Sequence, residues 1–241
     1  MFLKVRNQTP NLSFSVKSSL KGGKTLPKTK VLVVDDQVVA RDMFMLYLNS
    51  SEKYEFVGSV SSAAKAVDFV ADNKVDLIIM DIFMTDGSNG FSAAESVKKL
   101  HPEIKIVAVT SMVEGLLLRR AREIGVESFW YKEAQEETIL DVLDRTVAGE
   151  RVYPDAPPKT ELGLASNDSF TDRELEVLRL MTIGLTNSKI AQKLNIGEGT
   201  VKTYIHNMLE KTGFENRTEL AIEARIKGIV VSLDDIPDRN N

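Results

Sequence analysis

The chain has 241 residues, of which 43% are hydrophobic and 27% charged, as in one large globular domain or two ordinary ones. It contains no cysteine, which excludes disulfides and thiolate metal sites. The formal net charge of −4 gives no general affinity for nucleic acid, so a DNA-binding face would have to be local. No apolar run approaches the roughly 20 residues that span a bilayer, and we expect no membrane partner.

The first 29 residues contain five lysines, one arginine and no acidic residue. Ser, Gly and Pro are frequent there, and helical periodicity is absent. We predict a basic, disordered tail over residues 1–29. A transit peptide is a less favoured alternative, because the stretch is rich in Lys rather than Arg and has no apolar face.

Strand patterns alternate with helix patterns between residues 30 and 150. The predicted strands span residues 30–34, 56–60, 75–80, 104–109 and 128–131, and the predicted helices span 38–48, 63–70, 93–100, 114–124 and 136–147. Strands that are apolar throughout are buried on both faces. The pattern therefore predicts an α/β fold, a doubly wound five-stranded parallel sheet.

Residues 151–169 contain three prolines together with Gly, Ser and Asn, which predicts a linker. Four helix patterns and no strand follow, so residues 170–231 are expected to form a small all-α four-helix domain, and 232–241 a tail. The predicted helices begin at Asp172, Thr186, Glu198 and Thr218. Thr171 and Glu174 have the spacing of a capping box at the first of them.

Polar residues stand at the carboxyl ends of four predicted strands, where ligands bind in parallel sheets. These residues are Asp35, Asp36, Asp81, Thr110 and Lys132. Carboxylates brought close together repel one another, and a hard divalent cation such as Mg²⁺ relieves that repulsion. A carboxylate beside a metal can attack a phosphoryl group, whose oxygens the hydroxyl and the ammonium would bind. The alternative is that the acids only solvate loops.

The same residues resemble the receiver domain of two-component response regulators, a flavodoxin-like fold, over residues 30–150. The resemblance implies that Asp81 accepts a phosphoryl group from a histidine kinase. It also implies that Asp36, Asp81 and the Phe83 carbonyl hold Mg²⁺, while Asp35 acts through water. Thr110 and Lys132 would bind the phosphoryl group, and Phe129, at the family's aromatic switch position, would turn inward.

The sequence departs from the usual pattern of that family at positions that follow the acceptor residue. Thr85 replaces the usual Pro, and the expected glycine comes nine positions after the acceptor, as Gly90, rather than eight. Ser111 replaces an Ala. These changes leave every proposed ligand in place. The residues two after Asp81 and two after Thr110 are Phe83 and Met112, which cannot orient water, so we predict slow self-dephosphorylation.

The predicted helix 198–212 has one apolar face, with Val201, Ile205, Met208 and Leu209, and one polar face. With the helix before it and a short turn, this is a helix-turn-helix pattern, whose second helix enters the major groove. A helical hairpin with a solvated polar face is the alternative. Residues 170–231 resemble the C-terminal domain of NarL/LuxR-type regulators, with Gly197 in place of the usual N-cap Ser.

That resemblance and the positions of the lysines give two sets of candidate residues. We expect DNA contacts from Lys189, Lys193, Thr200, Lys202, Thr203, His206, Asn207 and Lys211. We expect the fourth helix to form a homodimer through Thr218, Ala221, Ile222 and Arg225.

The sequence thus indicates a cytoplasmic, phosphorylation-dependent transcriptional regulator that is not an enzyme. One alternative is a receiver-type interaction module that works without phosphorylation. Another is a phosphatase of the haloacid-dehalogenase type. The segment from Asp81 to Thr85 partly matches that enzyme motif, but Phe83 replaces its acid/base Asp.

Overall fold

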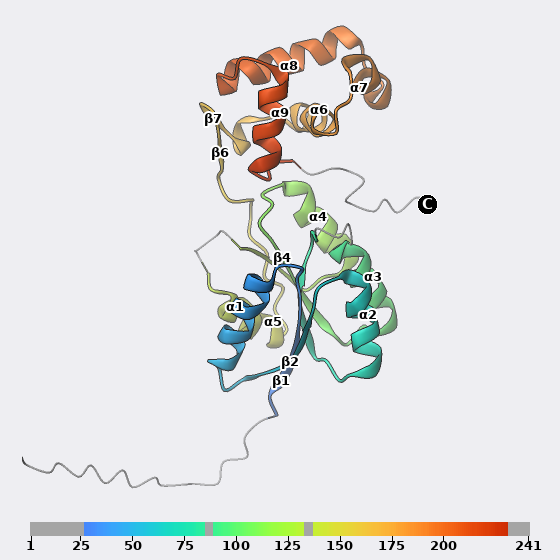
Figure 1. The fold of residues 1–241 in the computed structure, drawn as a ribbon, viewed down its shortest axis with the longest axis vertical. Coiled ribbons are helices and arrows are strands. Elements are labelled where there is room, and N and C mark those ends of the chain that lie inside the picture. Colours follow the sequence, from blue (N-terminus) through green and yellow to red (C-terminus); the bar gives the residue numbers. More distant parts are fainter. Residues whose placement is uncertain (1–26, 85–88, 133–136, 231–241) are drawn as a thin grey trace, which may run out of the picture.

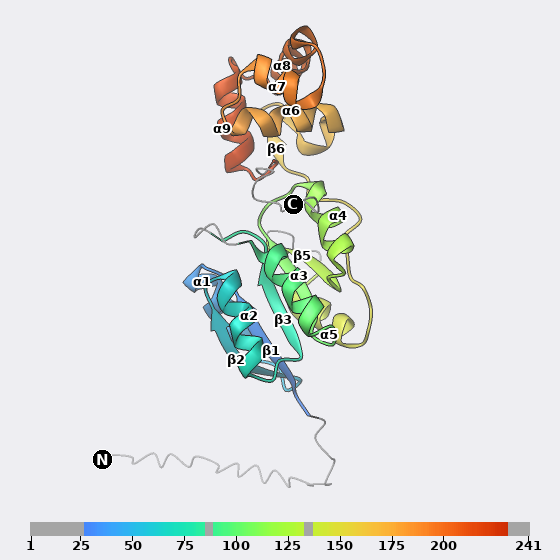
Figure 2. The ribbon, with the colours of Figure 1, turned by 90° about the vertical axis from the view of Figure 1, so that its right-hand side faces the viewer.

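The computed structural model describes residues 27–84, 89–132 and 137–230. Within these ranges the chain forms an α/β domain followed by a helical domain (Figure 1 and Figure 2). Most of the two predicted tails, and Thr85, lie outside the described residues. No helix in the described ranges is long and apolar enough to cross a membrane.

The α/β domain contains five parallel strands in the order β2-β1-β3-β4-β5. The strands are β1 (Thr29–Val34), β2 (Tyr54–Val60), β3 (Leu77–Asp81), β4 (Lys105–Thr110) and β5 (Ser128–Tyr131). The helices are α1 (Val38–Asn49), α2 (Ala63–Asp72), α3 (Gly90–Leu100), α4 (Gly115–Ile124) and α5 (Ile139–Val147). The predicted doubly wound five-stranded parallel sheet is confirmed.

Successive residues of each strand face opposite sides of the sheet and supply two cores. Leu32, Ile78 and Ile106 pack with α2, α3 and α4 on one side. Their neighbours Val31, Leu77 and Val107 pack with α1 and α5 on the other. Both faces are therefore covered, which explains the continuous apolar runs of the central strands and fixes their carboxyl ends in place.

The buried face of α1 differs from the apolar repeat by which the helix is predicted. That repeat includes Val39 and Leu46, which are 81% and 65% exposed. The buried side chains are Ala40, Phe44 and Leu48. Because α1 carries apolar residues on more than one side, its periodicity predicts a helix but not which side packs.

The helical domain contains α6 (Asp172–Thr182), α7 (Asn187–Leu194), α8 (Glu198–Thr212) and α9 (Arg217–Ile226), which confirms the four predicted helices. The Thr171–Glu174 capping box is also confirmed, and the Thr171 N–H donates to Glu174 Oε2 at 2.8 Å. Leu178, Ile190 and Met208 are fully buried in a core to which all four helices contribute.

The segment predicted as a linker contacts a domain at each end. Near its start, the Val152 carbonyl accepts a 2.8 Å hydrogen bond from the Phe129 N–H of β5. Near its end, β6 (Glu161–Leu162) and β7 (Ala165–Ser166) form a hairpin, followed by the short 3₁₀ helix η1 (Asn167–Ser169). Gly163 turns this hairpin with φ 63°, and a Cβ there would lie 2.0 Å from the Thr212 carbonyl oxygen. Proline content predicts the linker but not these contacts.

Candidate functional site

Three carboxylates meet at the carboxyl ends of β1 and β3. One oxygen from each of Asp35, Asp36 and Asp81 lies within 4.8 Å of the others. Asp35 is fully buried and Asp81 is 3% exposed. The cluster follows from the topology, because β1 and β3 are neighbours in the sheet. An all-oxygen set of this kind is chemically suited to Mg²⁺.

Lys132 follows β5 and lies between two of these acids. Its Nζ donates to Asp35 Oδ2 at 2.8 Å and to Asp81 Oδ2 at 2.9 Å. Burial raises the pKa of Asp81 to about 6, with Lys132 opposing the shift and Asp35 adding to it. Burial acts to lower the pKa of Lys132, but Asp81 and Asp35 together hold it above its usual value. At neutral pH, Asp81 is mostly ionised and Lys132 is charged.

Thr110 ends β4 beside this cluster. Its carbonyl accepts a 2.9 Å hydrogen bond from the Lys132 N–H, which ties the two residues together across the strand ends. The Thr110 hydroxyl oxygen accepts a 3.0 Å hydrogen bond from the Met112 N–H. The hydroxyl is therefore engaged with the loop that follows β4.

Phe129, the expected aromatic switch residue, lies inside the receiver domain, and its role as a switch stays a prediction. The ring is already 1% exposed. It packs edge-on against Tyr131, with ring centroids 5.0 Å apart, and stacks with Tyr153 of the linker at 6.3 Å. Tyr153 therefore covers the Phe129 ring, which lies inside the receiver domain.

The loop after Asp81 closes on the acceptor strand. The Phe83 N–H donates to Asp81 Oδ1 at 3.4 Å, and Phe83 pairs with Asn89 in an isolated bridge. The Gly90 N–H donates to the Ile82 carbonyl at 2.9 Å, and a Cβ on Gly90 would lie 2.0 Å from the Asp81 carbonyl oxygen. Gly90 therefore fits where a side chain cannot. Residues 85–88, which include Thr85, lie outside the described ranges.

Arg41 supports the acidic pair, and the sequence reasoning missed it. Its Nη1 donates to the carbonyl oxygens of Asp35 at 2.7 Å and Asp36 at 2.9 Å. These bonds fix the backbone of both acids to the first turn of α1. Because both acceptors are backbone carbonyls, no pattern of side chains in the sequence marks this contact.

The helical domain has the predicted helix-turn-helix geometry. Asn195 makes the turn between α7 and α8 with φ 53°. Val201, Ile205 and Met208 are buried as expected, and Gly197 is the N-cap. On the opposite face of α8, Lys202 and His206 are 64% and 70% exposed at their side chains. The same helix carries acids beside them, Glu198 at 3.2 Å from Lys202 and Glu210 at 3.4 Å from His206.

The other candidate residues of this domain differ in exposure. Those exposed are Lys189, Lys193, Thr200, Thr203, Thr218, Ile222 and Arg225, and those half-buried are Asn207 and Ala221. Lys211 is bound within its own domain, since its Nζ donates to the two Glu174 carboxylate oxygens at 2.7 and 2.8 Å and to the Ser169 carbonyl at 3.0 Å. A phosphate contact from Lys211 stays a prediction.

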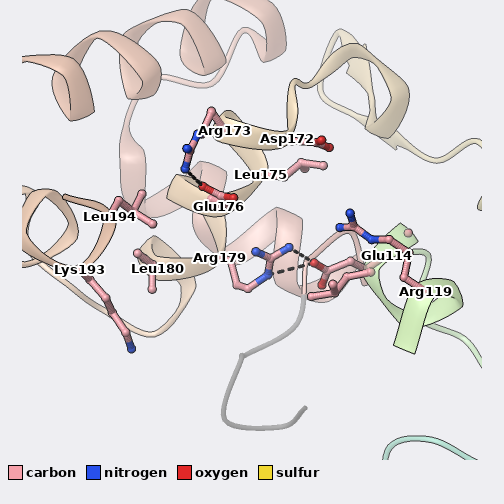
Figure 3. Close-up of a pocket in the computed structure, with 12 residues that line it drawn as sticks. Glu114, Arg119, Asp172, Arg173, Leu175, Glu176, Arg179, Leu180, Lys193 and Leu194 are labelled. Carbon is pink, nitrogen blue, oxygen red and sulfur yellow. Dashed lines mark hydrogen bonds and ion pairs between the residues drawn. The ribbon is translucent and has the colours of Figure 1, made fainter. Parts of the chain in front are cut away.

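The two domains are joined by a buried ion pair that the sequence reasoning did not indicate. Arg179 of α6 donates through Nε to Glu114 Oε1 at 2.9 Å, and its Nη2 contacts the same oxygen (Figure 3). Arg179 is 7% exposed and Glu114 is 2% exposed. Beside the pair, the Val113 N–H donates to the Gly228 carbonyl at 2.9 Å, and Val113 packs into the core of the helical domain.

Two family models match the chain. The response regulator receiver domain matches residues 31–144, and the bacterial regulatory proteins of the luxR family match residues 168–224. Together with the fold and the site, these matches show that the chain belongs to the response regulators that carry a LuxR-type DNA-binding domain. It is a transcriptional regulator of the NarL/LuxR type.

Similar proteins include the response regulator protein VraR of Staphylococcus epidermidis, 35% identical over 200 residues that make up 81% of this chain and 95% of that protein. VraR of Staphylococcus aureus is 34% identical over the same shares. Among solved structures, RcsB from Salmonella enterica serovar Typhimurium on promoter DNA with the phosphomimetic BeF₃⁻ has a TM-score of 0.58 and 18% identity, covering 88% of this chain and all of that one. RcsB dimers bound to DNA have a TM-score of 0.57 and 19% identity, over 83% and 98%. The RcsB structures share the fold.

Proposed function

We propose that Asp81 accepts a phosphoryl group from the phosphohistidine of a histidine kinase, and that this modification controls DNA binding. The observation that supports the proposal best is the contact of Lys132 with both Asp35 and Asp81 at a buried carboxylate cluster. One Asp81 oxygen attacks phosphorus, the phosphorus–nitrogen bond of the kinase breaks, and the leaving imidazole takes up a proton. Lys132 is placed to neutralise the phosphoryl oxygens.

The residues that would hold Mg²⁺ are Asp35, Asp36 and Asp81, together with the Phe83 carbonyl. The ion, when bound, would neutralise charge on the acceptor and on the phosphoryl oxygens. The three carboxylates alone would repel one another, which favours a cation at this edge of the sheet. Arg41 fixes the backbone of Asp35 and Asp36 through hydrogen bonds to their carbonyl oxygens.

For DNA binding, we infer that α8 reads the major groove through Lys202, Thr203 and His206, and that α9 pairs two chains through Ile222 and its neighbours. The uncovered polar face of α8 and the exposed face of α9 support this assignment. The expected partners are thus DNA, a histidine kinase and a second copy of the chain, and the expected location is the cytoplasm. We expect the protein not to turn over a separate substrate.

The acceptor assignment is tested with acetyl phosphate and Mg²⁺ on the full chain. We expect Asp81→Asn to lose phosphoryl incorporation, measured by intact mass, because amide oxygen is a poor nucleophile. Asp68→Asn, at an exposed acid of α2, is the matched control and should incorporate phosphate normally. Undiminished incorporation in Asp81→Asn would refute the assignment. A DNA affinity that does not change on phosphorylation would favour the interaction-module alternative.

A further inference from the structure

Lys211, in the last turn of α8, is bound within the helical domain by three hydrogen bonds. Its Nζ donates to Glu174 Oε2 at 2.7 Å, to Glu174 Oε1 at 2.8 Å and to the Ser169 carbonyl at 3.0 Å. The same nitrogen lies 5.6 Å from the centre of the Phe170 ring. An ammonium group has three N–H donors, and these three acceptors account for all of them. Lys211 could therefore bind a DNA phosphate only by giving up a bond to Glu174 or Ser169.

Glu174 needs this cation because its carboxylate is buried at the start of α6. The residue is 3% exposed, and its Oε2 also accepts hydrogen bonds from the Thr171 N–H at 2.8 Å and from the Thr171 hydroxyl at 3.0 Å. Burial acts to raise the pKa of Glu174, but the bonds from Lys211 and Thr171 together hold it below its usual value. Glu174 is therefore charged at neutral pH. Without Lys211, a buried charge would lose its ion pair, which is strongly unfavourable.

The bonds of Lys211 add directional contacts to the packing of α8, which lies above α6 in both views (Figure 1 and Figure 2). The buried side chains of α8 include Val201, Ile205 and Met208, whose apolar contacts stabilise the helix without prescribing one orientation. Its N-cap, Gly197, makes no side-chain hydrogen bond at the other end. Hydrogen bonds require particular distances and angles, so those of Lys211 restrict how α8 can turn or shift on the core.

The charges around Lys211 do not favour a DNA phosphate. An open groove lies between the start of α6 and α8, and it is lined by Thr171, Glu174, Tyr204, Asn207, Glu210 and Lys211. Among these six residues, two are acids and one is a cation. Because Glu174 already neutralises Lys211, Glu210 leaves the lining with one negative charge in excess. A phosphate entering this groove would be repelled.

We propose that Lys211 is a positioning residue for DNA recognition. Through Glu174 it ties the last turn of α8 to the start of α6, and it thereby sets how Lys202 and His206 meet the major groove. Lys211 itself makes no contact with DNA in this arrangement. The proposal rests on the proposed function of α8 as the helix that reads DNA. A phosphate contact would matter for every DNA sequence, whereas the position of α8 matters for the bases that it reads.

The first test measures binding of the full chain to random DNA and to an operator that the parent protein selects from random DNA. We expect Lys211→Met to weaken operator binding about tenfold, the effect of one weakened base contact, and to leave random-DNA binding nearly unchanged. The slope of log affinity against log salt concentration should stay as in the parent, because no phosphate contact is lost. Lys189→Met, at an exposed lysine of α7 expected to contact phosphate, is the reference, and its slope should fall by about 0.9.

The second test uses Glu174→Gln, for which the two roles of Lys211 predict opposite results. Gln also serves in capping boxes, so the start of α6 stays capped while Lys211 loses its ion pair. If Lys211 positions α8, operator binding weakens as in Lys211→Met, and the double variant is no weaker than either single one. If Lys211 contacts phosphate, the freed cation strengthens binding to both DNAs. Glu176→Gln is the matched control on the same helix, because Glu176 pairs with Arg173 at the surface, and it should change operator binding by less than about twofold.

Lys211→Arg separates positioning from a general loss of structure. Arginine can bind both oxygens of Glu174, so operator binding should recover to near that of the parent. Circular dichroism checks that each variant is folded, and Glu174→Gln alone decides between the two roles if Lys211→Met is not.

A salt slope lowered by about 0.9 in Lys211→Met would overturn the proposal. Stronger DNA binding by Glu174→Gln, or operator binding unchanged in both variants, would overturn it as well. If Lys202→Met leaves operator binding unchanged, the proposed function of α8 as the reading helix fails instead.

Discussion

At the residue scale, the surroundings of Asp81 have opposing effects on the charge of its carboxylate. Burial and Asp35 disfavour its charge, whereas Lys132 favours it, and the balance raises its pKa to about 6. The folded protein therefore binds a proton on Asp81 more tightly than the unfolded chain, where the pKa is near 3.8. The ionised carboxylate lowers stability above pH 6, and this loss is relieved as the pH falls toward 4.

We therefore expect Asp81→Asn to raise the free energy of unfolding of the receiver domain at pH 7.5, without divalent cations, by about 1–3 kcal/mol. The gain should shrink between pH 6 and pH 4, because Asp81 then becomes neutral in the parent as well. Mg²⁺ should stabilise only the parent. Urea unfolding at pH 7.5 and at pH 4, with and without Mg²⁺, measures these differences in the free energy of unfolding. An Asn variant less stable at pH 7.5 would contradict the argument.

The acceptor cluster could be predicted because parallel topology alone brings the ends of β1, β3, β4 and β5 to one edge. Arg41 could not, since its bonds go to backbone carbonyls and follow no side-chain pattern. Glu114 and Arg179 are 65 positions apart and belong to different domains, so no local periodicity marks them. The slow phosphoryl loss expected from Phe83 and Met112 stays a prediction.

At the scale of elements, Gly90 shows how the start of α3 is fitted to the acceptor strand. We expect Gly90→Ala to destabilise the receiver domain by about 1–3 kcal/mol, because its Cβ would overlap the Asp81 carbonyl oxygen 2.0 Å away. Phosphoryl incorporation should also fall, since the backbone of Asp81 must shift. Thermal unfolding and acetyl phosphate labelling measure the two effects.

Gly115→Ala is the matched control for that substitution. Gly115 begins α4, and a Cβ there meets only Pro157 Cγ at 3.6 Å, an ordinary contact. Its effect should lie between zero and a gain of about 1 kcal/mol, from helix propensity. Equal losses in the two variants would show that the receiver tolerates no added methyl group, rather than that Gly90 is special.

Long elements were predictable and short ones were not. The five strands of the sheet and all nine α-helices of the described ranges follow from apolar spacing and capping residues. The two-residue strands β6 and β7 are too short to show any period, and they depend on Gly163 meeting Thr212 from another part of the chain. The buried side of α1 was likewise undetermined, because tertiary packing decides between its apolar sides.

At the scale of the whole molecule, the net charge and the charges on α8 affect how selectively the protein binds DNA sequences. The net charge is −4, and the cations of α8 are partly offset by Glu198 and Glu210 on the same helix. Nonspecific attraction to phosphates is therefore weak, and binding has to rest on contacts with bases.

We expect Glu210→Gln to strengthen binding to random DNA by a few-fold at low salt, roughly the effect of one charge near phosphates, and to change operator binding less. The ratio of the two affinities should therefore fall. Glu215→Gln, at an exposed acid in the turn after α8, is the control and should change neither. Competition titrations over a range of salt concentrations measure the ratio, and an unchanged ratio in Glu210→Gln would contradict the expectation.

The two anchored ends of the linker limit how far the helical domain can lie from the receiver domain. Tyr153 is fixed to the receiver by its hydroxyl bond to the Val126 carbonyl, and the hairpin that begins at Glu161 is fixed to the helical domain. Only residues 154–160 lie between them, a stretch that spans at most about 25 Å when fully extended. The short linker therefore keeps the two domains of one chain close together, at an effective local concentration in the millimolar range. Any contact between them is intramolecular and does not depend on how much of the protein is present.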